Sequence, residues 1–183
     1  RRRRPKDRGP GTQLSGVNAD YMTSGNTDAA GGQDLVGDFS ATGMWLYSNA
    51  LWTQLSGVNV EQTLIAAVDL SGDDIVGDFG PTGLWLWNGT TWAIMSGVNA
   101  ELVIRSNVDA DANDELAVDF GTLGLWLIDG GAWSLLSGQN PEALLAGDLD
   151  GDSREELLAD LGALGLWRWQ GGTWSQLSSG NPQ

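Results

Sequence analysis

The side chains best placed to do chemistry are oxygen ligands that recur at alternate positions of two short polar segments. They occupy positions 1, 3, 5 and 9 of each segment: Asp148, Asp150, Asp152 and Glu156 in one, and Asn107, Asp109, Asp111 and Glu115 in the other. Alternate residues of a tightly curled loop converge on one point, and such a cluster of hard oxygen ligands suits Ca²⁺. Without a cation the carboxylates would repel one another. The spacing therefore predicts a structural calcium cofactor.

Two related segments carry weaker versions of this pattern. The first offers Asn26, Asp28 and Asp34 but lacks an oxygen at position 5, and another is one residue shorter, with Ala67 at position 1. We expect calcium affinity to fall from the segment at 148 to that at 107 and then to that at 26, with the segment at 67 empty. The alternative is that Asp and Asn only form hairpin turns here.

These segments belong to a repeat of about 41 residues. The phrase LSGVN begins at Leu14 and Leu55, and variants of it begin at Met95, Leu136 and Leu177. A tryptophan keeps the same phase at Trp45, Trp85, Trp126 and Trp167. The repeats cover residues 19–59, 60–99, 100–140 and 141–183, within a domain that spans residues 12–183.

Each repeat has the composition of four short strands. In the second repeat we expect strands at residues 63–68, 75–79, 84–87 and 91–95, with Asn88-Gly89 forming a tight hairpin. The third of these strands is apolar on both faces, which is typical of a sheet packed between two neighbours. The fold class is therefore all-β, a β-propeller of four four-stranded blades, with the metal segments in the first hairpin of each blade. Arg168 replaces leucine on this strand of the last blade, so that face is wet or meets an acidic partner.

The loop spacing resembles the FG-GAP (or VCBS) repeat of integrin-α-like propellers, roughly D-x-[DN]-x-D-G-x-x-D before an apolar strand. The resemblance covers residues 11–183 and implies a β-propeller, Ca²⁺ in the first hairpin, and an extracellular role in adhesion or carbohydrate contact. The chain departs from the family at loop position 6, where Ser153 and Ala112 replace glycine, and in having four blades where the family usually has seven.

Aromatic side chains offer a second kind of site. One tryptophan begins the fourth strand of each repeat beside a turn, and an exposed indole there could stack on a sugar ring: Trp52, Trp92, Trp133 and Trp174. Packing between blades is the favoured alternative, because tryptophan is the largest core side chain.

Catalysis is not expected. Paired carboxylates could suggest a glycosidase, but every pair recurs with the repeat, whereas catalysis needs one unique constellation. A repeated aspartate, at 38, 78, 119 and 160, is expected to accept backbone N–H bonds in the turn that follows it. The chain has no Cys and no His, which excludes disulfides, thiolate chemistry and the usual zinc ligands.

Charge is divided unevenly along the chain, whose formal net charge is −15. Residues 1–11 form a basic arm, and the acidic remainder should repel nucleic acid and anionic membranes. No apolar run is long enough to span a bilayer, so membrane insertion is not expected.

The start of the chain carries a surplus copy of the fourth-strand phrase at residues 12–18. We predict an extra N-terminal strand there, whose open edge pairs within the chain or with a neighbouring subunit. The basic arm would dock on an acidic body, unless it is a propeptide remnant. The candidate assembly residues are Arg1, Arg2, Arg3, Arg4, Leu14, Val17 and Arg168.

Together these features predict a non-enzymatic structural or adhesion module, stabilised by calcium and located outside the cell or on its surface, in a prokaryote. Homo-oligomer or filament formation is expected, and glycans are candidate partners. The alternatives are a lectin-like carbohydrate-binding propeller and an accessory domain of a larger secreted enzyme. Four blades could close alone, or two chains could share a larger ring.

Overall fold

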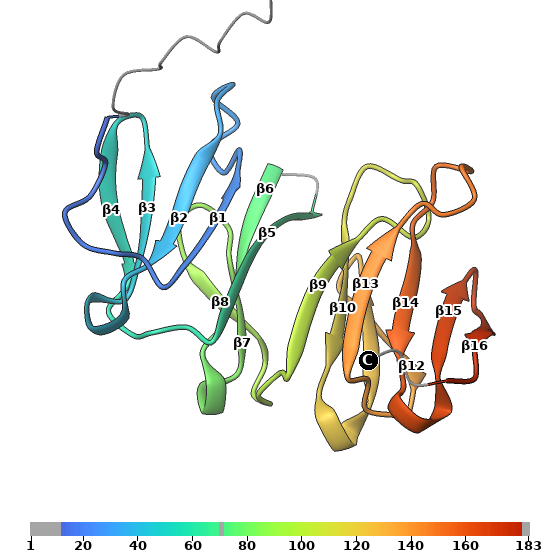
Figure 1. Ribbon diagram of the computed structural model, residues 1–183. Coiled ribbons are helices and arrows are strands. Elements are labelled where there is room, and N and C mark those ends of the chain that lie inside the picture. The colour runs from blue at the N-terminus through green and yellow to red at the C-terminus, as the bar shows by residue number, and fades with distance from the viewer. Residues whose placement is uncertain (1–11, 70–71, 181–183) are drawn as a thin grey trace, which may run out of the picture.

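The computed structural model describes residues 12–69 and 72–180, which form sixteen β-strands joined by tight turns and loops. The strands build four antiparallel sheets of four strands each (Figure 1). Within these residues, none of the helical segments is long and apolar enough to cross a membrane. The all-β prediction is confirmed.

Each sheet corresponds to one repeat. The first two contain β1 (Tyr21–Gly25), β2 (Asp34–Asp38), β3 (Met44–Ser48) and β4 (Leu51–Ser56), and then β5 (Gln62–Asp69), β6 (Gly72–Asp78), β7 (Leu84–Trp87) and β8 (Trp92–Ser96). The last two contain β9 (Leu102–Ser106), β10 (Glu115–Asp119), β11 (Leu125–Asp129) and β12 (Ala132–Ser137), and then β13 (Ala143–Gly147), β14 (Glu156–Asp160), β15 (Leu166–Gln170) and β16 (Thr173–Ser178).

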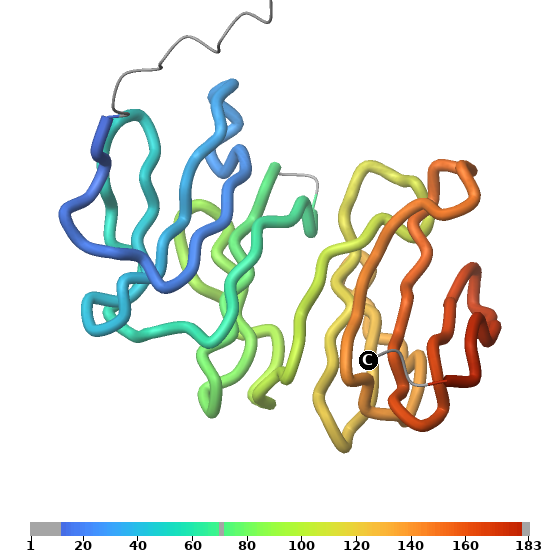
Figure 2. The backbone as a smooth tube through the Cα atoms, viewed as in Figure 1, coloured from blue at the N-terminus to red at the C-terminus, as the bar shows by residue number. Residues whose placement is uncertain are grey.

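The four sheets are the blades of a β-propeller. In every sheet the strands pair in chain order, and the first strand of one blade contacts the first strand of the next: β1 with β5, β5 with β9, and β9 with β13. The blades follow one another from blue to red, with blades 1 and 4 at opposite ends of the row (Figures 1 and 2). The four blades therefore form an open arc.

A single helical turn links the second and third strands of each blade. In blade 2 it spans Gly80–Thr82, where Oδ1 of Asp78 accepts a hydrogen bond from the N–H of Gly80 (3.1 Å). Asp119 and Asp160 accept the equivalent bond at 2.9 Å. The prediction for the repeated aspartate is confirmed at these three positions.

The hydrophobic core lies between the blades and not within them. Each blade has a downstream face, which contacts the next blade, and an upstream face, which contacts the previous one. In blade 2, Leu84 and Leu86 belong to the downstream face and pack with residues of blade 3, whereas Ile75 and Trp87 belong to the upstream face and pack with blade 1. Both faces of these strands are apolar for this reason.

The predicted extra N-terminal strand is wrong. Residues 12–20 contain no strand; instead Ser15 Oγ accepts a hydrogen bond from the N–H of Val17 (3.0 Å), which bends the segment into a turn. The segment passes beside β4 before it enters β1 (Figure 1). Because it contacts the upstream face of blade 1 and not a strand edge, its backbone groups do not form a ladder. The basic arm, with Arg1 to Arg4, lies outside the described residues.

Candidate metal centre

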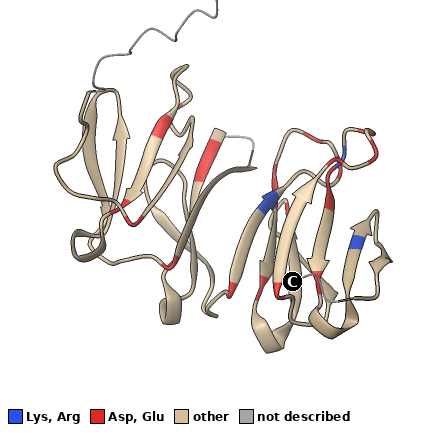
Figure 3. Ribbon diagram, in the orientation of Figure 1, with Lys and Arg blue, Asp and Glu red and all other residues tan. Residues whose placement is uncertain are grey.

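The candidate metal loops are the first hairpin loops of the blades, and all four lie at the same end of the molecule (Figure 1). Acidic residues concentrate in the loops that follow β9 and β13 (Figure 3). Left-handed backbone conformations at Ala110 (φ 63°) and Ser153 (φ 75°) curl these two loops. Of the predicted ligands, Asp148, Asp150 and Asp152 lie together in the fourth loop, and Asp109 and Glu115 lie together in the third.

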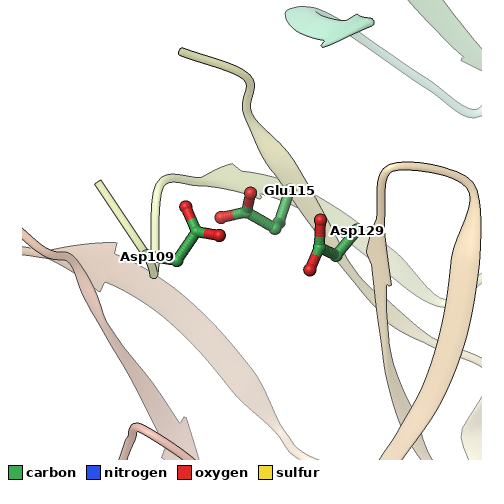
Figure 4. A group of neighbouring side chains, drawn as sticks. All are labelled: Asp109, Glu115 and Asp129. Atoms are coloured by element: carbon green, nitrogen blue, oxygen red, sulfur yellow. The ribbon is translucent and has the colours of Figure 1, made fainter. Parts of the chain in front are cut away.

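In the third loop, three carboxylates lie together. Asp109, Glu115 and Asp129 each offer an oxygen within 4.8 Å of the others (Figure 4). Glu115 begins β10 and is only 1% exposed, while the two aspartates are exposed. One oxygen of Glu115 accepts a hydrogen bond from the N–H of Val108 (2.7 Å). Its other oxygen is buried and has no hydrogen-bond partner within the described residues, and the same is true of Asn107 Oδ1.

The electrostatics of this loop favour a bound cation. Burial above all, with the charges of Asp109, Asp129 and Asp111, raises the pKa of Glu115 to about 7, although the bond from Val108 opposes the shift. A buried, unpartnered carboxylate oxygen among like charges is unfavourable unless it is protonated or meets a cation. Oxygen ligands of this kind fit Ca²⁺.

Sequence reasoning missed Asp129, because it lies at the end of β11 and not in the loop. The equivalent positions in the other blades are Ser48, Asn88 and Gln170, at steps of 40 or 41 residues. Ser48 and Gln170 each donate a hydrogen bond at 2.9 Å to the acid at loop position 3, Asp28 and Asp150 respectively. In blade 3 alone an acid occupies this position. Comparing the residue at the end of the third strand across the four repeats would have identified Asp129 as a further candidate ligand.

The fourth loop brings Asp148, Asp150 and Asp152 together, also within 4.8 Å. Both oxygens of Asp148 accept backbone bonds, from Gly151 (2.6 Å) and Ser153 (3.0 Å). The bond from Gln170 is the main cause that lowers the pKa of Asp150. Hydrogen bonds from within blade 4 therefore stabilise the carboxylates of Asp148 and Asp150 without an ion.

Glu156 occupies position 9 of the fourth loop and is fully buried. One of its oxygens accepts a bond from the N–H of Leu149 (2.8 Å), and the other has no partner within the described residues. The unpartnered oxygen seen at Glu115 therefore recurs here, at the equivalent position.

The first and second loops lack such a cluster within the described residues. Asp34 accepts bonds from the N–H (2.9 Å) and hydroxyl (2.7 Å) of Thr27. The carboxylate of Asp28 accepts hydrogen bonds from the N–H of Ala30 and from the side chains of Ser48 and Asn49. Asn26 nevertheless keeps a buried oxygen without a partner, as Asn107 does. In the second loop, burial raises the pKa of Asp74 to about 6.

The repeated tryptophans lie on the upstream faces of the blades, where three of them contact the preceding blade and Trp52 contacts the N-terminal segment. The indole N–H groups of Trp52, Trp92 and Trp174 donate to main-chain carbonyls of Leu14, Leu55 and Leu136, at 3.0, 3.0 and 2.9 Å. Trp133 makes no such bond within the described residues and is 37% exposed. Three of the four candidate sugar platforms are thus held by a main-chain carbonyl, two of them at a junction between blades, and Trp133 is the most accessible.

Trp133 lines a cavity of about 420 Å³ with Met95, Val98, Phe120, Leu123 and Trp126. An equivalent cavity of about 330 Å³ lies at the start of the chain, between Leu14, Val17, Phe39, Trp45 and Trp52. Both are lined mainly by apolar side chains.

The candidate assembly residues that the structure describes lie at the two ends of the arc. Leu14 and Val17 are 46% and 59% exposed on the upstream face of blade 1. Arg168 lies on β15, on the downstream face of blade 4, and its Nε is buried without a partner within the described residues.

Buried acids follow the repeat. Within the described residues they occupy two equivalent sets of positions: Asp34, Asp74, Glu115 and Glu156 at the hairpin loops, and Asp38, Asp78 and Asp119 at the turns. The buried acids themselves therefore recur from blade to blade, and blade 3 differs in the exposed Asp129 beside Glu115.

Comparisons with known proteins support the fold. No family model matches the sequence, and no curated protein matches it. The crystal structure of BBS1N in complex with ARL6DN is similar to this chain, with a TM-score of 0.62 and 10% sequence identity over 85% of this chain. The chain spans about half (51%) of that protein, which contains a β-propeller domain.

A second similar structure is that of the V. cholerae biofilm matrix protein Bap1. Its TM-score is 0.49 at 17% identity, and the match covers 82% of this chain and 28% of that one.

Proposed function

We propose that the chain is a non-enzymatic structural module, built from FG-GAP/VCBS-type repeats and stabilised by Ca²⁺. The proposal rests mainly on Glu115, whose buried, unpartnered oxygen faces Asp109 and Asp129. The same unpartnered oxygen at Glu156 supports a second site in the fourth loop.

Five residues of blade 3 would hold the ion: Asn107, Asp109, Asp111, Glu115 and Asp129. A bound cation would neutralise the clustered charge and join the β9–β10 hairpin to the end of β11. Because the ligands belong to two different hairpins of one blade, the ion would stabilise the blade. We therefore rank the third loop above the fourth in affinity, the reverse of the order that the loop residues suggested.

An extracellular location suits this chemistry, since extracellular modules bind calcium at the concentrations found outside cells. The absence of Cys and His from the sequence and its formal net charge of −15 are compatible with a scaffold or adhesion role. The acidic surface would repel nucleic acid and anionic membranes.

Calcium titration of the chelator-treated protein tests the proposal. We expect Ca²⁺ to raise the melting temperature and its binding to be measurable by calorimetry. Asp129→Asn should weaken calcium binding at the third loop by about tenfold, because the charge of the ligands sets calcium affinity. Glu142→Gln is the matched control, since it removes one exposed acid outside the loops. Absence of calcium binding, or equal effects of the two substitutions, would contradict the proposal.

A lectin-like role is a second candidate, and the exposed Trp133 beside its cavity favours it. An indole face can stack on an apolar sugar face. The test is a glycan array with the unchanged chain and with Trp133→Ala, using Leu164→Ala as a control at an exposed turn in blade 4. A blank array at high protein concentration would count against this role.

A further inference from the structure

The three junctions between blades share a hydrogen bond from a main-chain N–H of one loop to an acidic side chain of the next. The N–H of loop position 1 donates to the acid at loop position 8 of the next blade: Asn26 to Asp73 (2.6 Å), Ala67 to Asp114 (2.8 Å) and Asn107 to Glu155 (2.9 Å). At the second and third junctions the N–H of that acid donates back to the carbonyl of position 1, at 2.6 and 2.7 Å. At each junction a residue with a neutral side chain therefore presents its main-chain N–H to an acid of the next blade.

The junctions also share an apolar contact between third strands. A leucine on the downstream face packs in one cluster with a large residue of the next upstream face: Leu46 with Trp87, Leu86 with Ile128, and Leu127 with Trp169.

The two ends of the arc carry the uncovered halves of this interface. On the upstream face of blade 1, Met22 is 61% exposed, whereas the equivalent Val103 and Leu144 are buried by the preceding blade. On the downstream face of blade 4, Leu145 and Leu177 are 66% and 50% exposed. The equivalents of Leu145 in blades 2 and 3, Leu64 and Ile104, pack against the following blade.

These two end faces differ from the internal ones in ways that match each other. Blade 4 alone has Arg168 at the leucine position, and blade 1 alone has Tyr47 at the partner position. A guanidinium packs favourably on an aromatic ring. Blade 4 alone also has an acid, Asp148, at loop position 1, and blade 1 alone has a neutral residue, Gln33, at position 8. The changed residues of blade 4, Arg168 and Asp148, therefore complement the changed residues of blade 1, Tyr47 and Gln33.

We propose that the downstream face of blade 4 binds the upstream face of blade 1 of a second copy of this chain. The new junction would repeat the internal ones, with Arg168 on Tyr47, Asp148 beside Gln33, and Leu145 near Met22. Such a head-to-tail interface produces a ring or an open row of chains. It replaces the added N-terminal strand as the route of assembly.

Residues 12–18 occupy part of this interface. Their sequence is identical to residues 53–59, and the carbonyl of Leu14 accepts the bond from Trp52 that the carbonyl of Leu55 accepts from Trp92. The segment therefore stands where Leu177 of the second copy would stand. It acts as a cap that must leave the upstream face before the copies join.

Sedimentation velocity of the full chain over a wide concentration range tests the proposal. We expect Leu14→Ser with Val17→Ser to loosen the cap and to shift the 19.4 kDa species toward twice that mass or more, at lower concentration than the unchanged chain. Adding Leu177→Glu should restore the 19.4 kDa species. Leu51→Glu is the control, because Leu51 is 70% exposed on the strand face opposite Trp52.

A second variant tests the polar pair. Gln33→Glu places an acid beside Asp148 and should weaken the association of copies on the order of tenfold, because like charges repel across an interface. Gln139→Glu adds the same charge at an exposed position of blade 3 and should leave association unchanged. The proposal is overturned if the loosened chain keeps its native circular dichroism and stays at 19.4 kDa, or if association survives both Leu177→Glu and Gln33→Glu.

Discussion

At the scale of single residues, the identity of one side chain at the end of the third strand changes the charge of each hairpin loop. Ser48 and Gln170 donate hydrogen bonds to the acid at loop position 3, whereas Asp129 adds a carboxylate to the pair formed by Asp109 and Glu115. The loops therefore share a backbone but differ in the charge that they present to an ion.

Exchanging these residues should transfer affinity between loops. Gln170→Asp removes the donor to Asp150 and adds a carboxylate, so we expect the fourth loop to bind Ca²⁺ about tenfold more tightly. Calorimetric titration of this variant and of Gln170→Asn measures the change. If both variants bind calcium equally, charge at this position does not control the site.

The buried aspartates of the turns give a pH dependence that is separate from metal binding. Burial above all, with the charge of Glu101, raises the pKa of Asp119 from 3.8 to about 6, although the bond from Gly121 opposes the shift. The folded state therefore holds a proton that the unfolded state releases between about pH 4 and pH 6. Stability from this group falls as the pH rises through that window and is constant above it.

Asp119→Asn keeps an acceptor for Gly121 but cannot ionise. With chelator present, we expect the variant to melt at a higher temperature than the unchanged chain at about pH 7.5, and to gain less on acidification to about pH 5. Calorimetry at both pH values measures this. Equal gains in the two proteins would show that Asp119 does not titrate as its burial implies.

Part of the candidate site could be predicted from the sequence. The ligands within the loops could be predicted, because the spacing of side chains at alternate positions of a curled loop is a local property of the sequence. Asp129 could not be found by this local pattern, because it meets Glu115 only through the pairing of β10 with β11. The acceptors for Trp52 and Trp92 lie 38 and 37 residues away, so local reasoning could not supply them either.

At the scale of elements, short apolar runs bounded by turns indicate which strands form. The residues predicted for the third strand of blade 2 are those of β7, because both faces of that strand are apolar and turns bound it. The surplus phrase at residues 12–18 has the same sequence as residues 53–59 but does not form a strand. A strand needs a neighbour along its edge, and no local pattern specifies that neighbour.

The junction tryptophans allow a matched test of how elements are held together. Trp174→Phe removes the N–H bond to Leu136 and should lower the free energy of unfolding by about 0.5–1.5 kcal/mol beyond the loss of packing. Trp133→Phe is the control, since Trp133 makes no such bond within the described residues. Urea denaturation of both variants gives the comparison, and equal losses would contradict a stabilising role for the bond.

At the scale of the whole molecule, stability should vary along the arc. The two internal blades are covered on both faces, whereas each end blade is covered by a neighbour on one face only. In repeat architectures stability is approximately the sum of each unit and its junctions. The end blades therefore lack one junction each.

Hydrogen exchange followed by mass spectrometry should show this gradient. At low protein concentration, where copies are separate, we expect amides of β6 and β10 to exchange more slowly than those of β2 and β14. Uniform protection across the four blades would contradict the expectation that the end blades are less stable because each lacks one junction. A rise in the protection of β2 and β14 with protein concentration would agree with the proposed contact between copies.

One rule at every junction has a consequence for how such chains change their length. Each unit brings one surface that fits its predecessor and another that fits its successor, so a duplicated or deleted unit leaves the remaining contacts intact. The number of units is thereby free to vary while the sequence of each stays nearly constant, and only the outermost residues need to adapt when a terminus moves.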